Sequence, residues 1–451
     1  MISVASGSRR LLLAGAALVA VAAWPAVSDS GVVSPYIFTA APRYEPQAWL
    51  AGHDRFPAGA TLMLVSGAAR KPLVQGFQAS ADAVVSYDGA RVLFAGKRDA
   101  ASHWQIWETA IEAPAPRQIT SGDSDCIRPL YIPDGRVAYT RLSAAGSAVE
   151  IIPLAGGQGA SKAERLTYAP GWFLTDDVLR DSRILLEYSP AGQTRELYTV
   201  YPDGTGVEAM RCDHGPDRSG ARQVSSGDVI FRAGARLARF TPALAAQTDV
   251  PQPKGEPAGP IAELSGGRWI VPLRPASGSS FHLELWDAAA GQGRELEAAR
   301  GVNAVEPVVV SPRVPPREFP SALVTTRTAG NLLCLNARQS KTPIAGSPAA
   351  VRVYTRGPQG QSIPLGQAGV ERDGSFYVQV PADAPIRMEI LDGSGGVIRG
   401  ERTWFWMRAS EQRICVGCHA GPERSPENKV PEVLLHSTVP VKMLGDAGRS
   451  Q

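Results

Sequence analysis

A short pattern recurs along the first two thirds of the chain and constrains its fold more than any other feature. Each copy has a turn-forming pair, a polar or charged residue nearby and then a short apolar run. Three clear copies begin at Asp88, Asp134 and Asp181, and two weaker ones begin at Ser226 and Gly266. The starts are 46, 47, 45 and 40 residues apart. A period of 40–50 residues with several strands per unit is typical of a β-propeller, whose four-stranded blades pack radially around an axis.

The repeat therefore predicts a mainly β fold, with a propeller of about six blades over residues 29–320. Residues 60–80 and 303–335 are strand-like but outside the pattern, and we expect them to complete the first and last blades. The chain has 46 glycines and 37 prolines, which suit short strands joined by tight turns and disfavour helix interiors. The blade pattern resembles the TolB-like propeller repeat.

A proline-rich stretch at residues 311–321 marks the end of the predicted propeller. Beyond it, short segments with alternating polar and apolar residues are separated by turn pairs such as Asp373-Gly374 and Asp392-Gly393. Strands at this spacing predict a small β-sandwich-like domain over residues 321–400. Residues 401–451 then form a separate segment, which carries the chemistry.

The N-terminal residues 1–28 have the layout of a secretory signal peptide. Arg9-Arg10 is followed by an apolar run of 13 residues, Leu11–Ala23, and then by small residues. We therefore expect a periplasmic or otherwise exported protein, with an uncleaved anchor as the alternative. The run is shorter than the roughly 20 residues that cross a bilayer, and no other apolar stretch is long enough. We expect no membrane span in the mature chain.

Charge excludes one class of partner. The chain carries 46 basic and 43 acidic side chains, a net charge of +3, and they are dispersed along it. A nucleic-acid-binding surface needs a concentrated basic patch, so we expect no nucleic-acid partner.

The most specific motif is Cys415-Val416-Gly417-Cys418-His419, which has the Cys-x-x-Cys-His spacing of c-type haem attachment. In such sites two thiols add to the vinyl groups of the porphyrin, and the adjacent histidine reaches the iron. We therefore predict one covalent haem c, bound by Cys415, Cys418 and His419, with His419 as the metal ligand.

Three other uses of a Cys-x-x-Cys pair stay open. It can be half of a zinc site, although no second pair exists in the chain. It can be a thioredoxin-like redox pair, which needs a βαβ setting, or a plain disulfide in an exported protein. The adjacent histidine and the export segment favour haem.

The surroundings of the haem are less defined by the sequence. Trp404, Trp406 and Met407 are candidates for its wall, and the alternative is that they belong to the sandwich core. Four residues are candidates for the sixth iron ligand, and an open position is a further alternative: His436, Met443, Met407 and His214. Three more cysteines have no assigned role, and an odd number implies a free thiol, a metal ligand or an external partner: Cys126, Cys212 and Cys334.

The C-terminal third also resembles a known family. The resemblance rests on these segments: Pro307–Asn336, Asp373–Phe376, Val380–Asp383, Ile390–Asp392, Arg402–Trp404 and Cys415–His419. Together they are similar to the hydrazine synthase alpha-subunit family, which combines a propeller with a haem c-bearing β domain.

In the enzyme itself, the resemblance implies a periplasm-like compartment, a multi-haem complex and N–N bond formation at a c-type haem. The iron of that haem takes a tyrosine shortly after the motif. Residues 420–426 contain no tyrosine here, and the chain has a single Cys-x-x-Cys-His. These departures indicate a paralogue rather than the enzyme.

Three functions follow as hypotheses. The first is an exported monohaem protein with a redox or electron-transfer role and a redox partner protein. The second is a haem enzyme that acts on a small nitrogen or oxygen species. The third is a propeller scaffold with a structural haem. Whether the protein is an enzyme stays open at this level.

Overall fold

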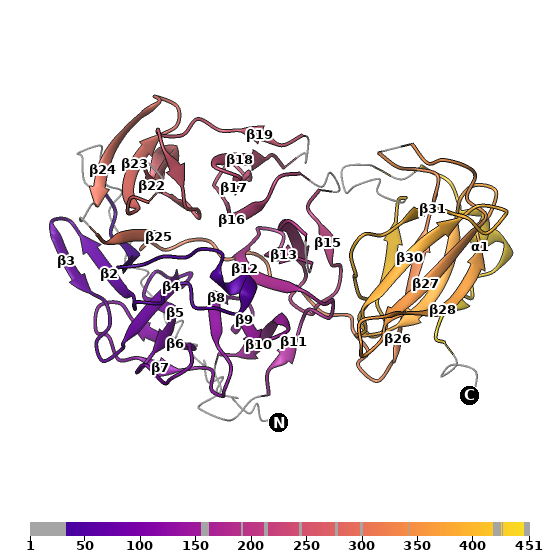
Figure 1. Ribbon diagram of the computed structural model, residues 1–451, viewed down its shortest axis with the longest axis horizontal. Helices are drawn as coiled ribbons and strands as arrows, with labels where there is room; N and C mark the ends of the chain where they lie inside the picture. Colours follow the sequence, from indigo (N-terminus) through magenta and orange to yellow (C-terminus); the bar gives the residue numbers. More distant parts are fainter. Residues whose placement is uncertain are drawn as a thin grey trace, which may run out of the picture. The chain divides into compact units, whose positions relative to one another are not determined.

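The structure is a computed structural model (Figure 1). It describes residues 33–154, 162–190, 193–211, 215–242, 246–275, 278–297, 301–341, 343–417, 425 and 427–445. The predicted signal peptide, residues 1–28, lies outside them. Within these ranges, no helix has the length and apolar character needed to cross a membrane.

Residues 36–309 form six antiparallel sheets, which we call blades 1 to 6 (Figure 1). Blade 1 pairs β25 (Asn303–Val309), β1 (Tyr36–Ala41), β2 (Thr61–Ser66) and β3 (Ala69–Pro72). Blade 2 comprises β4 (Ala79–Val85), β5 (Arg91–Lys97), β6 (Gln105–Ala110) and β7 (Arg117–Gln118). Blade 3 comprises β8 (Cys126–Tyr131), β9 (Arg136–Ser143), β10 (Gly146–Pro153) and β11 (Glu164–Arg165).

The next three blades have the same order. Blade 4 comprises β12 (Trp172–Val178), β13 (Ile184–Ser189), β14 (Glu196–Val200) and β15 (Glu208–Ala209). Blade 5 comprises β16 (Arg218–Gln223), β17 (Val229–Ala233), β18 (Arg236–Phe240) and β19 (Thr248–Asp249). Blade 6 comprises β20 (Glu256–Pro257), β21 (Ala262–Glu263), β22 (Arg268–Arg274), β23 (His282–Asp287) and β24 (Gln292–Glu297). Two short 3-10 helices complete this part: η1 (Ala48–Ala51) and η2 (Ser265–Gly267).

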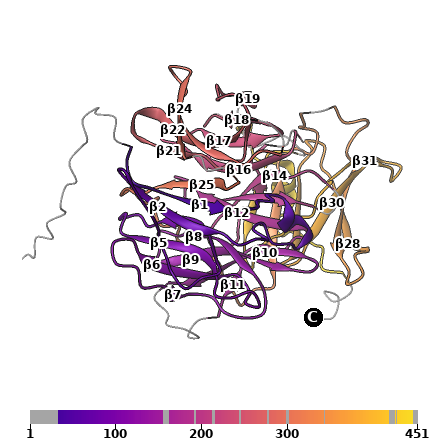
Figure 2. The ribbon, with the colours of Figure 1, turned by 60° about the vertical axis from the view of Figure 1, so that its left-hand side comes forward.

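Blade 1 is built from both ends of this region. Strand β25 pairs antiparallel with β1, with Tyr36 opposite Val309 and Asn303 opposite Ala41 (Figure 2). Residues 60–80 and 303–335 were expected to complete the first and last blades. Strands β2, β3 and β25 instead lie in one sheet, because the chain closes the ring by returning to its start. Residues 329–334 belong to no blade, since they form a strand of a C-terminal sheet.

The sequence repeat corresponds to the turn between the first two strands of blades 2 to 5, and in blade 6 to the turn between β21 and β22. Each turn has a residue with a left-handed backbone: Gly89, Gly135, Ser182 and Gly227, and in blade 6 both Gly266 and Gly267, with φ between 72° and 92°. Glycine adopts this conformation without the strain that a Cβ introduces, which explains why glycine recurs there. The prediction of a mainly β chain with four-stranded, propeller-like antiparallel sheets is confirmed.

Buried charges lie between the inner strands of the blades. Arg55 is 2.6 Å from Asp82 and 2.7 Å from Glu306, and all three side chains are almost fully buried. Arg128 approaches the same two carboxylates at 3.4 and 3.5 Å. Asp82, Arg128 and Glu306 all have positive φ angles of 53–58°. Sequence reasoning missed this network, because its members are up to 251 residues apart.

The C-terminal residues form two further sheets, drawn in orange and yellow in Figure 1. One contains β32 (Gln412–Cys415), β26 (Ala329–Cys334), β29 (Phe376–Pro381) and β33 (Val441–Lys442). The other contains β28 (Ser362–Gly369), β27 (Ala350–Arg356), β30 (Ile386–Leu391) and β31 (Val397–Gly400). A short helix, α1 (Glu432–His436), lies between β32 and β33 in the sequence. The two sheets share one apolar core, which includes Leu332, Val353, Val378 and Ile390, as in a β-sandwich.

Candidate functional site

Cys415, the first cysteine of the predicted haem motif, is the last residue of β32. This strand runs parallel to β26 and places Cys415 opposite Cys334. The pairing continues past the strand, since the Leu335 amide donates to the Cys415 carbonyl at 2.9 Å. The sheet therefore fixes where the motif begins. Cys418 and His419 lie outside the described residues.

A cavity of about 780 Å³ opens beside Cys415, and Cys415, Val416 and Gly417 contribute to its lining. Its other walls come from blade 4 and the loop after β14, from the linker near Phe319, and from residues 401–414. A volume of this order is typical of sites that bind a small molecule or a cofactor.

One wall of the cavity is apolar and aromatic. It includes Phe405, Ile414, Tyr201 and Phe319. The rings of Tyr201 and Phe319 stack with centroids 4.2 Å apart and an angle of 15° between their planes. Flat apolar surfaces of this kind suit a planar aromatic ligand.

The polar side of the cavity is organised around Glu411, which is 8% exposed. Its carboxylate accepts hydrogen bonds from the backbone amides of Arg408 at 2.7 Å and Gly206 at 3.0 Å. It also accepts from the Arg413 guanidinium at 2.8 Å, and Arg413 donates to the Val207 carbonyl at 3.2 Å. Glu411 therefore links the strand that ends at Cys415 to a loop of blade 4.

Trp406 and Arg408 add further hydrogen bonds between this C-terminal segment and the loop of blade 4. Trp406 is 1% exposed and donates its indole N–H to the Gly204 carbonyl at 2.9 Å. Arg408 donates to the Asp203 carbonyl and forms an ion pair of 2.8 Å with Asp383. Burial raises the pKa of Asp383, and the nearby Arg408 only partly opposes this effect. These contacts hold the walls of the cavity in place.

The residues that the sequence suggested as a haem wall do not line this cavity. Trp406 belongs to the apolar core of the propeller, and Trp404 packs against that core. Met407 is fully buried in the core of the two C-terminal sheets. Phe405, which lies between these residues in sequence, faces the cavity instead.

The suggested sixth ligands are placed elsewhere too. Met407 and Met443 are fully buried in the C-terminal core, and neither lines the cavity. His436 is paired with Glu371 at 3.1 Å, and His214 lies outside the described residues. Met388 does line the cavity, and it is the one methionine or histidine among the described lining residues. Met388 lies on the same face of β30 as Ile386 and Ile390, at the edge of the C-terminal core. The sequence around it could not show that it also lines a cavity, because other lining residues come from blade 4.

The unassigned cysteines also differ in their surroundings. Cys126 is fully buried in the propeller, and burial raises the pKa of its thiol to about 11, which makes it unreactive. Cys334 is buried in the C-terminal core. Cys212 lies outside the described residues.

Comparisons with known proteins relate the chain to one family. Residues 351–420, which run from β27 to just past the cysteine motif, match the family described as the hydrazine synthase alpha subunit middle domain. The hydrazine synthase subunit alpha of Kuenenia stuttgartiensis is 40% identical over 60 residues, which is 13% of this chain and 7% of that protein. The matched segment is therefore a small part of that relative's length.

The fold similarity extends further. The structure of Kuenenia stuttgartiensis hydrazine synthase superimposes with a TM-score of 0.77 at 17% identity, covering 90% of this chain and 72% of that one. TolB from Acinetobacter baumannii gives a TM-score of 0.48 at 13% identity, covering 62% of this chain and 67% of that one. The predicted resemblance is confirmed: the chain is a hydrazine synthase alpha subunit-like protein, and at 17–40% identity it is a distant homologue, as a paralogue would be.

Proposed function

We propose that this protein is an exported monohaem c protein with a redox or electron-transfer role. Cys415 and Cys418 would hold the haem through thioether bonds, and His419 would bind the iron. The observation that carries the proposal is the position of Cys415 in the lining of a cavity of about 780 Å³. The Cys-x-x-Cys-His spacing supplies the attachment chemistry.

The described residues of the cavity fit a haem. Phe405, Tyr201 and Phe319 offer an aromatic surface for the macrocycle. Arg402 is exposed and also lines the cavity, and its guanidinium group can bind a propionate carboxylate, whereas Arg413 is already bonded to Glu411 and to the Val207 carbonyl. When bound, the haem supplies one-electron chemistry, while the chain's residues bind and orient it and limit the access of water.

The lining also bears on the second axial ligand. We infer that Met388 would supply this ligand, because it lines the cavity, whereas Met407 and Met443 are buried in the C-terminal core. Histidine and methionine together form the ligand pair of electron-transfer cytochromes and raise the reduction potential. This pairing favours electron transfer to a partner protein.

Export is part of the same proposal. Residues 1–28 have the layout of a secretory signal, and c-type haem is attached after export. A redox partner would then be a protein of the same compartment.

The test is a pyridine haemochrome spectrum, combined with the intact mass, of protein exported from a host that matures c-type cytochromes. A c-type α-band and a mass increase of one haem support the proposal. The double variant C415S/C418S should lose the covalent haem, while C126S, which changes a buried thiol of the propeller, should keep it. Wild-type protein without haem from that host would overturn the proposal, and the motif would then be a disulfide or a metal site.

A second candidate is a haem enzyme that acts on a small nitrogen or oxygen species. It is supported by the relationship to the hydrazine synthase alpha subunit and by two tyrosines, Tyr198 and Tyr201, among the residues that line the cavity. Carbon monoxide separates the two candidates. An electron-transfer haem with two protein ligands resists carbon monoxide, whereas an enzyme with an open iron position binds it readily.

A further inference from the structure

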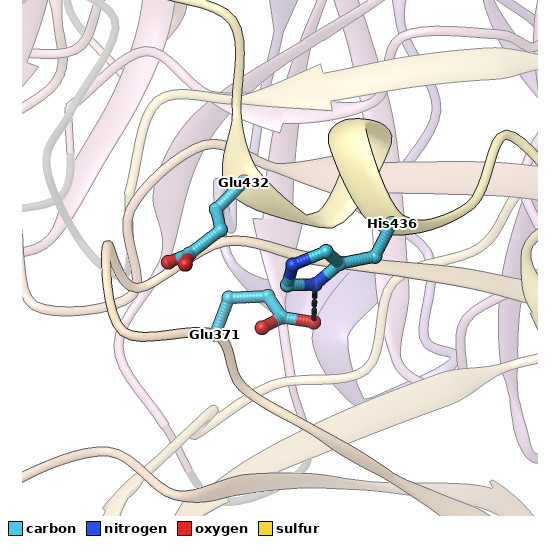
Figure 3. Close-up of side chains that lie close together, drawn as sticks. All are labelled: Glu371, Glu432 and His436. Carbon is cyan, nitrogen blue, oxygen red and sulfur yellow. Dashed lines mark ion pairs between the residues drawn. The ribbon is translucent and has the colours of Figure 1, made fainter.

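A second group of ligand-type side chains lies apart from the cavity, on the C-terminal sheets. Glu371, Glu432 and His436 each offer one ligand atom, and these atoms lie within 4.8 Å of one another (Figure 3). Glu371 precedes the Asp373-Gly374 turn between β28 and β29, whereas the other two come from α1. We propose that these three residues bind a divalent transition-metal ion.

The helix places its two ligands on one side. Glu432 and His436 are the first and last residues of α1, four positions apart, and side chains at this spacing lie one above the other on a helix face. Figure 3 shows the His436 ring beside the Glu371 carboxylate, with the Glu432 carboxylate on the other side of the Glu371 stem. The His436 Nδ1 atom is 3.1 Å from Glu371 Oε1, which is the place where an ion would replace the proton that joins them.

The turn and the helix are joined independently of any metal. The Glu432 amide donates to Asp373 Oδ2 at 2.9 Å, and the Val433 amide donates to Ser375 Oγ at 3.0 Å. Asp373 Oδ1 in turn accepts from the Ser375 hydroxyl at 2.6 Å. These bonds fix α1 against the 371–375 turn, so the three ligands are held close before an ion arrives. A site held in this way avoids part of the ordering entropy of binding.

The ligand set selects a class of metal. Two carboxylates balance the charge of a divalent ion, and imidazole favours zinc, iron, nickel or copper, whereas carboxylates also suit manganese. Three protein ligands leave further positions for water, because His436 is 59% exposed. Arg372 binds Glu432 at 3.0 Å and lowers the pKa of that carboxyl, so Glu432 stays ionised.

A metal here would connect the turn before β29 to α1. Helix α1 follows the Cys-x-x-Cys-His motif in sequence and precedes β33. The ion would therefore fasten the segment after the motif to the sheet that carries Cys415. The inference does not depend on the haem proposal.

The test uses Mn²⁺ as the probe, because Mn²⁺ prefers oxygen and nitrogen to thiolate and so avoids the cysteines of the chain. The free ion is measured by its electron paramagnetic resonance signal in titrations of the full-length protein. We expect one site in the wild type. E371Q and H436Q should each weaken it by at least about tenfold, the scale of losing an important contact of a metal site.

His103 provides the matched control. Its Nδ1 lies 3.0 Å from Asp125 Oδ1, the same kind of pair, and it is not part of the three-ligand group found among the described residues. H103Q should bind Mn²⁺ like the wild type. Both test variants should fold, since a largely exposed pair contributes little to stability, and circular dichroism checks this. Equal Mn²⁺ affinity in wild type, E371Q and H436Q, or an equal loss in H103Q, would overturn the inference.

Discussion

The backbone of Gly417 packs directly against Gln339. A Cβ atom on Gly417 would lie 2.4 Å from the Gln339 carbonyl oxygen and 2.9 Å from the Asn336 carbonyl oxygen. Real Cβ atoms do not approach backbone oxygens so closely, so the residue just before the second motif cysteine, Cys418, must be glycine for the chain to leave β32 along this path.

We therefore expect G417A to displace the segment from Cys415 onward. Overpacking of this kind destabilises a protein by about 1–3 kcal/mol. The ratio of covalent haem to protein should fall, and urea unfolding should show the loss of stability. G393A is the control, because a Cβ on Gly393 meets nothing within 4 Å. Full haem content and stability in G417A would contradict this account of the motif.

Glu411 is the next residue to test, since its carboxylate accepts hydrogen bonds from three groups of the cavity wall. E411A leaves the buried amides of Arg408 and Gly206 and the Arg413 guanidinium without their acceptor. Removing one partner of a buried ion pair destabilises a protein by about 3–5 kcal/mol. Urea unfolding measures this free energy.

The control for Glu411 is an exposed ion pair. Asp249 pairs with Arg236 at 3.0 Å, and both side chains are more than half exposed. D249A should change the free energy of unfolding by no more than about 1 kcal/mol. If E411A and D249A lowered the free energy of unfolding by similar amounts, burial would not determine the contribution of Glu411.

The blades could be predicted from the sequence because the turn that carries the repeat has a residue with a left-handed backbone at a fixed place. Glycines such as Gly89 and Gly135 therefore recur there at a regular spacing. Blade 1 gave no such signal. Its β25 comes from the far end of the region, and strand pairing between such distant segments leaves no local pattern.

The site was predictable only where its residues are consecutive. The motif at Cys415 specifies its chemistry locally, but the cavity beside it also needs Tyr201 and Phe319, which are far away in sequence. In residues 404–407, neighbouring side chains point to different sides of the chain, an alternation that sequence reasoning did not use. Trp406 faces the propeller core, whereas Phe405 faces the cavity.

Two buried carboxylates, Asp82 on β4 of blade 2 and Asp176 on β12 of blade 4, should respond to substitution with opposite signs. Burial alone would raise the pKa of Asp82, but Arg55 and Arg128 outweigh burial and hold this pKa below its usual value. Burial raises the pKa of Asp176 well above its usual value, and Glu187 adds to the effect. The Oδ1 atom of Asp176 has no hydrogen-bond partner within the described structure.

The pH dependence follows from these directions. The contribution of Asp82 is present above the unfolded pKa of about 3.9 and is lost as the pH falls through its lower folded pKa. Asp176 behaves oppositely: its unfavourable contribution grows as the pH rises from about 3.9 to its raised folded pKa.

At pH 7, D82N should therefore lower the free energy of unfolding, by about 3–5 kcal/mol for a broken buried pair. D176N should raise it, since an amide keeps an acceptor for the Ala221 amide, now 2.9 Å from Asp176 Oδ2, without a buried charge. Urea unfolding from about pH 3 to pH 8, a range that crosses the unfolded pKa of about 3.9, checks both. A loss of stability in D176N as large as that in D82N would show that Asp176 is ionised and paired.

The last prediction concerns the second axial ligand of the haem. M388L replaces the Met388 thioether with a side chain of similar volume, which a core usually tolerates at less than about 1.5 kcal/mol. If Met388 binds the iron, the oxidised protein loses its sulfur-to-iron charge-transfer band, the reduction potential falls, and the reduced haem begins to bind carbon monoxide. M407L changes a methionine that is fully buried in the C-terminal core and does not line the cavity, so it should leave all three properties unchanged. If the wild type already binds carbon monoxide and M388L does not increase this binding, the iron has an open position. That result would favour the haem enzyme over the electron-transfer protein.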